Sequence, residues 1–132
     1  MTKRGNTWGL LLLSCLAMGA PRAVMAEGRP VATVLTVKVK GDRDVYLQKV
    51  KKLVALSEKL QSGGTIRVWR ATLAGPDSGL IFAVIEYANM EAMAKGVTKM
   101  QNDDDWKKLI KEVDQSNIRD VVSNELLEEI TP

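Results

Sequence analysis

The chain has 132 residues, of which 45% are hydrophobic, 27% charged and 5% aromatic, a composition typical of one globular domain and not of a disordered or collagen-like chain. The formal net charge is +3, but the first 26 residues contain three basic residues and no acidic one, so charges balance in the remainder and no nucleic-acid partner is expected. With no histidine and one cysteine, Cys15, the sequence excludes histidine-based catalysis, zinc sites of the usual Cys/His type and a disulfide scaffold.

Residues 1–26 have the pattern of a secretory signal peptide. A short basic start and an apolar run over residues 8–18 lead to a stretch that ends Ala23-Val24-Met25-Ala26, with small or branched residues where signal peptidase requires them. We therefore expect a periplasmic or secreted domain over residues 27–132, and no integral membrane span, because the apolar run is too short. In an alternative interpretation, Leu12-Leu13-Ser14-Cys15 is a lipoprotein box and the lipidated Cys15 anchors the protein.

The first half of the mature chain predicts a strand, a helix and a hairpin. Residues 31–40 alternate and are rich in branched side chains, which favours a strand. A helix capped by Asp42 or Asp44 runs to about Ser62 and stops at Gly63-Gly64, with an apolar stripe at spacings of three and four. Strands over 65–74 and 80–87 are joined by five turn residues, so they should pair antiparallel.

The second half predicts helices and a last strand. Asn89 can cap a helix that frays near residues 101–105, and a second helical stretch runs from Trp106 to about Gln115 with Asp103, Asp104 and Asp105 at its start. Residues 118–127 form the last element, a strand through Val121–Ser123, although residues 124–130 could equally be a helical end.

The order strand, helix, strand, strand, helix, strand defines an α+β ferredoxin-like β-α-β-β-α-β sandwich. In this architecture helices cover one face of the sheet. The strand 80–87 is apolar on both of its faces, so its second face also needs cover. The economical partner is a second copy of the chain, and we expect a homodimer with sheets packed face to face.

Three segments resemble the dimeric α/β-barrel superfamily, which includes antibiotic-biosynthesis-type monooxygenases and NIPSNAP-like proteins. They are Thr65-Ile-Arg-Val-Trp-Arg-Ala, Leu80-Ile-Phe-Ala-Val-Ile-Glu-Tyr-Ala-Asn-Met-Glu-Ala and Asp103-Asp-Asp-Trp-Lys-Lys-Leu. The resemblance covers residues 31–130 and implies a dimeric α/β barrel. Its haem-binding branches use a histidine, which this chain lacks, so no haem or other cofactor is expected. Its cofactor-free oxygenases use an asparagine and a tryptophan; here Asn89 follows the strand 80–87 and Trp69 lies within 65–74.

The candidate site residues lie in and after the hairpin. If the strand face that carries Trp69 and Arg67 lines a cavity between helices and sheet, the indole forms a wall and Arg67 lies at the mouth; alternatively Trp69 is core or dimer interface. Glu86 is the one charge in its strand, and if buried it could act as a catalytic base, or it forms an ion pair with Arg67 or Arg70. Tyr87 could donate a hydrogen bond to a ligand.

No metal site is expected. Asp103, Asp104 and Asp105 lack the Gly and Glu of a calcium loop and are better explained as helix capping. Met90, Met93 and Met100 are better explained as core and interface filler than as copper ligands.

Three functions are compatible with these patterns. The protein binds a small, largely apolar or aromatic molecule in an apolar pocket; it is a cofactor-independent monooxygenase that acts on an electron-rich aromatic substrate; or it is a structural or interaction protein of the cell envelope. The volume of the cavity between helices and sheet separates the third function from the other two.

Overall fold

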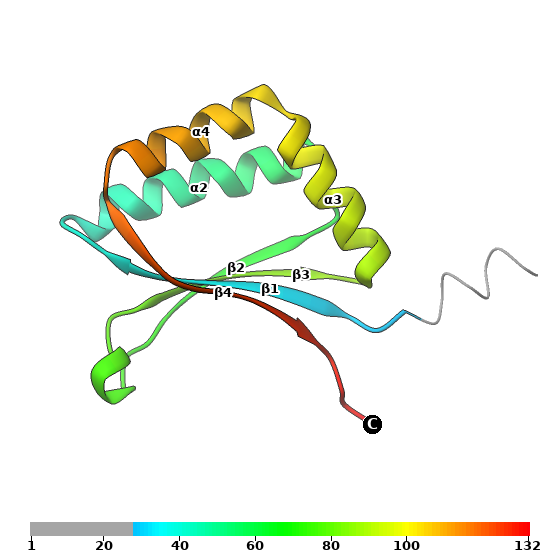
Figure 1. The fold of residues 1–132 in the computed structure, drawn as a ribbon, viewed down its shortest axis with the longest axis horizontal. Helices are drawn as coiled ribbons and strands as arrows, with labels where there is room; N and C mark the ends of the chain where they lie inside the picture. The colour runs from blue at the N-terminus through cyan, green and yellow to red at the C-terminus, as the bar shows by residue number, and fades with distance from the viewer. Residues whose placement is uncertain (1–27) are drawn as a thin grey trace, which may run out of the picture.

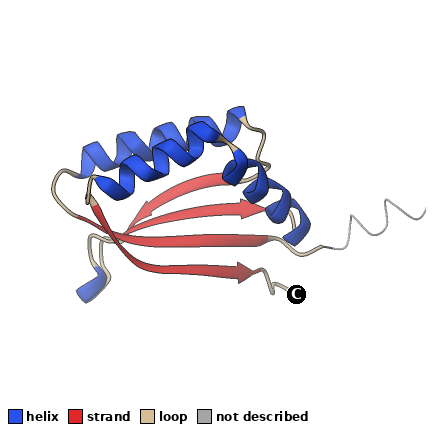
Figure 2. Cartoon of the chain, turned by 45° about the horizontal axis from the view of Figure 1, so that its top comes forward, coloured by secondary structure: helices blue, strands red, loops and turns tan. Residues whose placement is uncertain are grey.

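The structure, a computed structural model, describes residues 28–132, which form one sheet with the three α-helices on one face (Figures 1 and 2). The expected signal peptide, its cleavage site and the alternative lipid anchor at Cys15 lie outside the described residues. The elements are β1 (Val31–Val39), α2 (Arg43–Lys59), β2 (Thr65–Arg70), β3 (Ile81–Tyr87), α3 (Met90–Asn102), α4 (Asp104–Gln115) and β4 (Arg119–Glu128). No helix in residues 28–132 has the length and apolar character needed to cross a membrane.

The sheet has four strands in the order β2-β3-β1-β4, and each neighbouring pair is antiparallel. This order and the sequence of elements confirm the ferredoxin-like sandwich. Helices α2, α3 and α4 pack over one face, and the sheet face opposite them is left open (Figure 1). The core between the layers is centred on Val37, Tyr46, Val50, Ile81 and Val113.

Side-chain caps fix where the helices begin. The Asp42 carboxylate accepts a hydrogen bond from the Asp44 N–H (2.8 Å), and the Asn89 side chain accepts one from the Ala92 N–H (2.8 Å). Asp103 accepts from the Trp106 N–H (2.8 Å) and so starts α4 where α3 ends. The caps predicted at Asp42 and Asn89 are confirmed, and in the acidic cluster at residues 103–105 Asp103 is the cap while Asp104 and Asp105 lie in the first turn of α4.

Two strand boundaries differ from the sequence-based predictions. Strand β2 ends at Arg70 instead of residue 74, because the Gly79 N–H donates to the Ala71 carbonyl and closes the hairpin loop early. Strand β4 continues to Glu128, so a helical end over residues 124–130 is wrong; pairing with β1 along the whole of β4 satisfies its backbone as a strand.

Register assigns side chains to the two faces of the sheet. On the open face, two rows cross the strands in the order β2, β3, β1, β4: Trp69, Phe82, Thr36, Ser123 and Arg67, Val84, Val34, Glu125. Trp69 is 58% exposed, while Phe82 and Val84 are half-buried. Within residues 28–132 no α-helix covers this face, so none of these α-helices packs on the second apolar side of β3.

Strand β4 contains a β-bulge. Val121 lies opposite Val37 and Ser123 lies opposite Thr36, which leaves Val122 as an extra residue. Before the bulge, Arg119 faces the helices opposite Val39; after it, Asn124 faces the helices opposite Leu35. The bulge therefore exchanges odd and even positions on the helix side of β4.

Candidate functional site

An apolar cavity of about 120 Å³ lies between the sheet and the helices. Its walls come from stripes that the sequence predicts as inward-facing, namely Tyr46, Val50 and Leu53 of α2 and Trp106 and Ile110 of α4. The sheet contributes Leu35, Ile66, Ala83 and Ile85. Ala83 contributes only a methyl group to the floor beneath α2 and α4, so the side chains of the two layers leave space between them. Sequence periodicity shows which residues face inward but not whether their volumes fill the interior.

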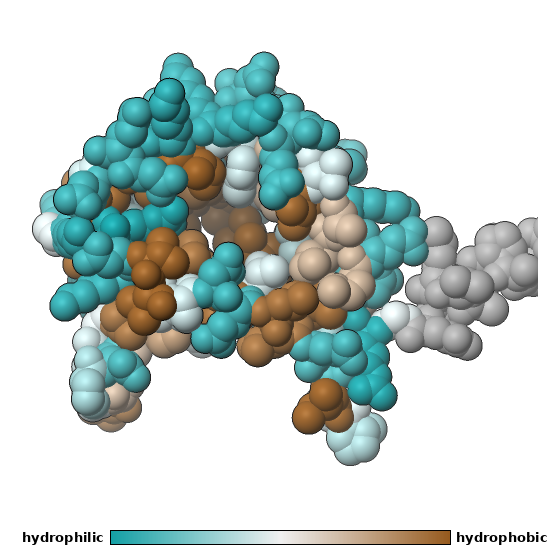
Figure 3. Space-filling view, in the orientation of Figure 1, coloured by the Kyte–Doolittle hydropathy of each residue, from teal (hydrophilic) through white to brown (hydrophobic). Residues whose placement is uncertain are grey.

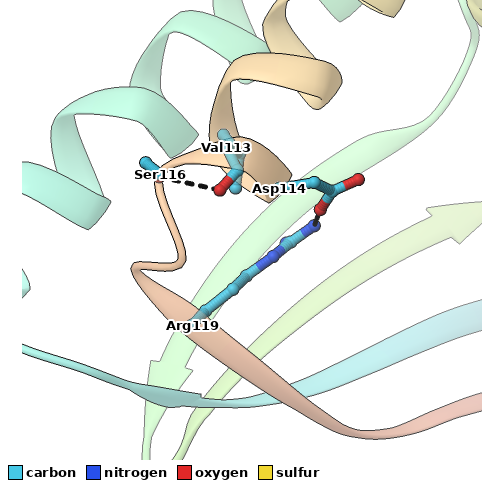
Figure 4. Close-up of polar contacts among 4 residues, drawn as sticks. All are labelled: Val113, Asp114, Ser116 and Arg119. Carbon is cyan, nitrogen blue, oxygen red and sulfur yellow. Dashed lines mark hydrogen bonds and ion pairs between the residues drawn. The ribbon is translucent and has the colours of Figure 1, made fainter.

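One charged side chain borders this cavity. Arg119, the first residue of β4, is 11% exposed, and its guanidinium Nη2 lies 3.3 Å from Oδ1 of Asp114 on α4 (Figure 4). Its Nε–H is buried and meets no hydrogen-bond acceptor within residues 28–132. The remaining polar lining consists of Thr33 and the Tyr46 ring, and no carboxylate lines the cavity.

A surface groove adjoins the cavity between α4 and β4. Trp106 and Ile110 line both the groove and the cavity, so their side chains form the wall that separates the interior from solvent. Figure 3 shows the surface hollowed between the helix layer and the sheet, with apolar residues at the bottom of the hollow. Lys107, Lys111 and Asp114 stand around the groove. Trp106 and Ile110 therefore lie where the groove and the cavity meet.

Three of the predicted site residues lie on the other side of the sheet. Trp69 and Arg67 are on the open face, so the expectation that their strand face lines the cavity between helices and sheet is wrong. Glu86 shares that face, where its side chain is 46% exposed and lies 3.6 Å from the Arg67 guanidinium. This is the cross-strand ion pair that the sequence analysis gave as the alternative to a catalytic base. Its partner is Arg67, because Arg70 lies on the helix side of the sheet. Glu86 is not buried in this chain and does not approach the cavity.

Tyr87 and Asn89 also stand apart from the cavity. The side-chain oxygen of Asn89 accepts the hydrogen bond that caps α3. Tyr87 is 3% exposed and packs against two glycines: a Cβ added to Gly64 would lie 2.8 Å from its Cε1, and one added to Gly96 would lie 2.9 Å from it. Burial raises the pKa of the Tyr87 hydroxyl, which has no hydrogen-bond partner within residues 28–132.

The five predicted residues therefore do not form one site. Trp69, Glu86 and Asn89 each border a different surface depression. The charged residue at the cavity that the sequence analysis did not identify is Arg119. A lone arginine at the start of an apolar strand is its only sequence signal, and strict alternation from the exposed end of β4 assigns it to the wrong face because of the bulge.

The described residues also bear on metal binding. Within residues 28–132 no three His, Cys, Asp or Glu side chains gather into a metal-binding cluster. Asp103 is engaged as a cap, Met100 is buried in the core and Met90 is exposed, so neither group is assembled as a ligand set.

Comparison with known proteins places the fold. No protein-family model matches the sequence, and no curated protein is significantly similar to it. Among solved structures, a NIPSNAP family protein of unknown function from Agrobacterium tumefaciens matches with a TM-score of 0.61 and 12% identity, over 80% of this chain and 95% of that one. A variant of SnoaB, a cofactor-independent oxygenase from Streptomyces nogalater, matches with a TM-score of 0.60 and 11% identity, over 79% and 96%.

A conserved protein of unknown function from Bacteroides thetaiotaomicron, described as a possible oxidoreductase, matches with a TM-score of 0.56 and 13% identity, over 77% of this chain and 99% of that one. Each match spans nearly the whole of the other chain. The protein therefore has the α+β ferredoxin-like fold of these structures, as the resemblance in its sequence predicts, and is structurally similar to NIPSNAP family proteins and to SnoaB.

Proposed function

We propose that the protein is an exported, homodimeric domain that binds a small apolar or aromatic molecule in the cavity between its helices and its sheet. The observation that carries this proposal is the apolar cavity of about 120 Å³ between the helices and the sheet. An engineered apolar cavity of about 150 Å³ takes up benzene, whereas drug-sized ligands need about 300 Å³ or more. The volume therefore limits the ligand to about one ring. Export rests on the signal-peptide pattern of residues 1–26.

The open face of the sheet supports the dimer, because a second copy of the chain can cover it. The centre of that face is apolar, with Phe82, Val84 and Val34 side by side, and its charges lie at opposite edges. Arg67 on β2 and Glu125 on β4 occupy the same row. A two-fold axis along the strands lays β2 of one copy over β4 of the other, so each Arg67 meets a Glu125 of the second copy.

The test uses toluene as the probe, together with a substitution on the sheet that fills the cavity. We expect toluene to raise the melting temperature of the protein, because it binds the folded state alone. The substitution Ala83→Leu places three further carbon atoms in the cavity, so it should abolish the shift while leaving the protein folded. Ala55→Leu, the same change at an exposed position of α2, is the control and should keep the shift. If toluene produces no shift, ligand binding in the cavity is wrong, and a structural or interaction protein of the cell envelope becomes the favoured function.

A second candidate is a cofactor-independent oxygenase, favoured by the structural similarity to SnoaB. Such a reaction needs a base that deprotonates the substrate before it passes an electron to O₂. No carboxylate lines the cavity, and Glu86 lies on the opposite face of the sheet, which is why ligand binding is placed first. Oxygen uptake with a panel of phenols and quinols tests this candidate. Uptake that Ala83→Leu abolishes and Glu86→Gln leaves unchanged would assign catalysis to the cavity without Glu86.

A further inference from the structure

The guanidinium of Arg119 is held between a surface carboxylate and the cavity. Its Nη2 lies 3.3 Å from Asp114 Oδ1, a long contact to a side chain that is 62% exposed. Water screens a carboxylate with that exposure, so it neutralises the arginine weakly. Arginine stays protonated at any physiological pH, and its positive charge therefore persists at the cavity wall.

The Nε–H of Arg119 is a donor without an acceptor. It is buried, and no oxygen of residues 28–132 reaches it. Buried polar groups in folded proteins are nearly always hydrogen-bonded, and an orphaned one needs an explanation. Besides Arg119, Thr33 and the Tyr46 ring are the polar groups of the cavity, so its walls offer few partners to hold a water molecule there. A ligand in the cavity would bring an acceptor to the Arg119 guanidinium.

The charged residues around the groove also favour an anionic ligand. Lys107 and Lys111 stand on the groove side of α4, and Lys107 lies 4.0 Å from Asp104, which is fully exposed. Asp114 is the one carboxylate on the groove, and it contacts Arg119. An anion that approaches the Trp106 and Ile110 wall therefore meets two lysines and then the guanidinium.

We propose that the ligand of this cavity is a monocyclic aromatic carboxylate, whose ring fills the apolar space and whose carboxylate accepts a hydrogen bond from the guanidinium of Arg119. A carboxylate is chosen because it is ionised at neutral pH, whereas a phenol is not. Charge-assisted hydrogen bonds are about twice as strong as neutral ones, so the arginine selects an anion over a neutral molecule of the same shape. This inference rests on the proposed function and names the substrate class of the same site.

The experiment compares benzoate with benzamide, its neutral isostere, by isothermal titration calorimetry at pH 7, with toluene as the probe of the apolar space. We expect benzoate to bind roughly tenfold more tightly than benzamide, the factor that one charge-assisted hydrogen bond supplies. Arg119→Gln should remove this preference and leave toluene binding in place. Arg29→Gln is the matched control. Arg29 is an exposed arginine that lies 3.8 Å from the carboxylate of Glu128, and it does not line the cavity.

A second variant keeps the inference testable if Arg119→Gln fails to fold. Asp114→Asn changes an exposed side chain and releases Nη2 from its only carboxylate partner within residues 28–132. It should raise the affinity for benzoate by about threefold and leave benzamide unchanged, since a competing surface charge is removed. An unchanged ratio of the two affinities in this variant would overturn the inference.

The outcomes separate the inference from the proposed function. If toluene and benzamide bind and benzoate binds no more tightly than benzamide, the cavity is a binding site and the anion proposal is wrong. If none of the three probes binds, the proposed function itself fails. A benzoate preference that survives Arg119→Gln would show that another group recognises the anion, and would also overturn the role of Arg119.

Discussion

At the scale of single residues, the Tyr87 hydroxyl is a buried polar group whose cost the fold accepts. Its ring needs the space left by Gly64 and Gly96, and its oxygen has no partner within residues 28–132. Burial raises its pKa above the usual tyrosine value of about 10, because the site cannot hydrate a phenolate. The folded state therefore holds this proton more tightly than the unfolded state. The resulting stability is present below about pH 10 and is lost as the pH rises above that value.

Tyr87→Phe tests this account. At pH 7 the free energy of unfolding should stay the same or rise by about 1 kcal/mol, because the substitution removes an unpaired hydroxyl and keeps the ring. Above pH 10 the variant should lose less stability than the wild-type protein, since it has no proton to release at this position. Urea denaturation at pH 7 and pH 11 measures both effects. A loss of more than about 1 kcal/mol at pH 7 would show that the hydroxyl has a partner after all.

The residue scale is also where sequence reasoning succeeded and failed most clearly. The Arg67 and Glu86 pair followed from opposite charges on two strands joined by a tight turn, and the structure contains it. Arg119 could not be placed, because its position depends on one extra residue in β4 and on the register with β1, a strand that lies far earlier in the sequence. Local patterns predict local pairs, whereas this cavity depends on the volumes of side chains from six separate elements.

At the scale of elements, the junction of α3 and α4 depends on Asp103, which ends one helix and caps the next. Asp103→Ala should reduce the free energy of unfolding by about 1 kcal/mol, because the Trp106 N–H then loses its acceptor. Asp105→Ala is the matched control: it lies in the first turn of α4, caps nothing, and should change stability by less than half as much. Thermal denaturation checks both variants. Equal losses would assign the effect to helix electrostatics and contradict the cap.

Element starts and ends were unequally predictable for a physical reason. Helix starts depend on one side chain close in sequence, so Asp42 and Asn89 could be identified as caps from the sequence. Strand ends depend on a partner strand. Residues 71–74 alternate like a strand but leave the sheet, while residues 124–128 stay in it because β1 continues alongside.

At the scale of the whole molecule, the open face of the sheet predicts a dimer, and Val84 lies near its centre. Val84→Asp should reduce the mass in light scattering from that of a dimer to that of a monomer, because it places an unpaired carboxylate in a desolvated interface, at a cost of about 3 kcal/mol or more. Val45→Asp is the control: the same substitution on an exposed turn of α2 should leave the mass unchanged. A wild-type protein that is monomeric at micromolar concentration would contradict the dimer.

The sequence predicted this requirement because it depends on composition alone. A strand with apolar residues on both of its faces needs two covering layers, whichever elements supply them. The sequence could not show that the candidate residues Trp69 and Glu86 lie on the open face of the sheet, since assigning residues to a face needs the register between β2 and β3.

The bulge at Val122 makes the length of β4, and not only its composition, a determinant of what the protein does. On one side of the bulge the strand presents Arg119 to the cavity, and on the other it presents Glu125 to the open face. In a regular strand both odd-numbered residues would share one face, so a single-residue deletion there would send one of them to the wrong compartment while every side chain stayed the same. Homologous chains should therefore tolerate exchanges of residue type along β4 far better than a change of one in its length.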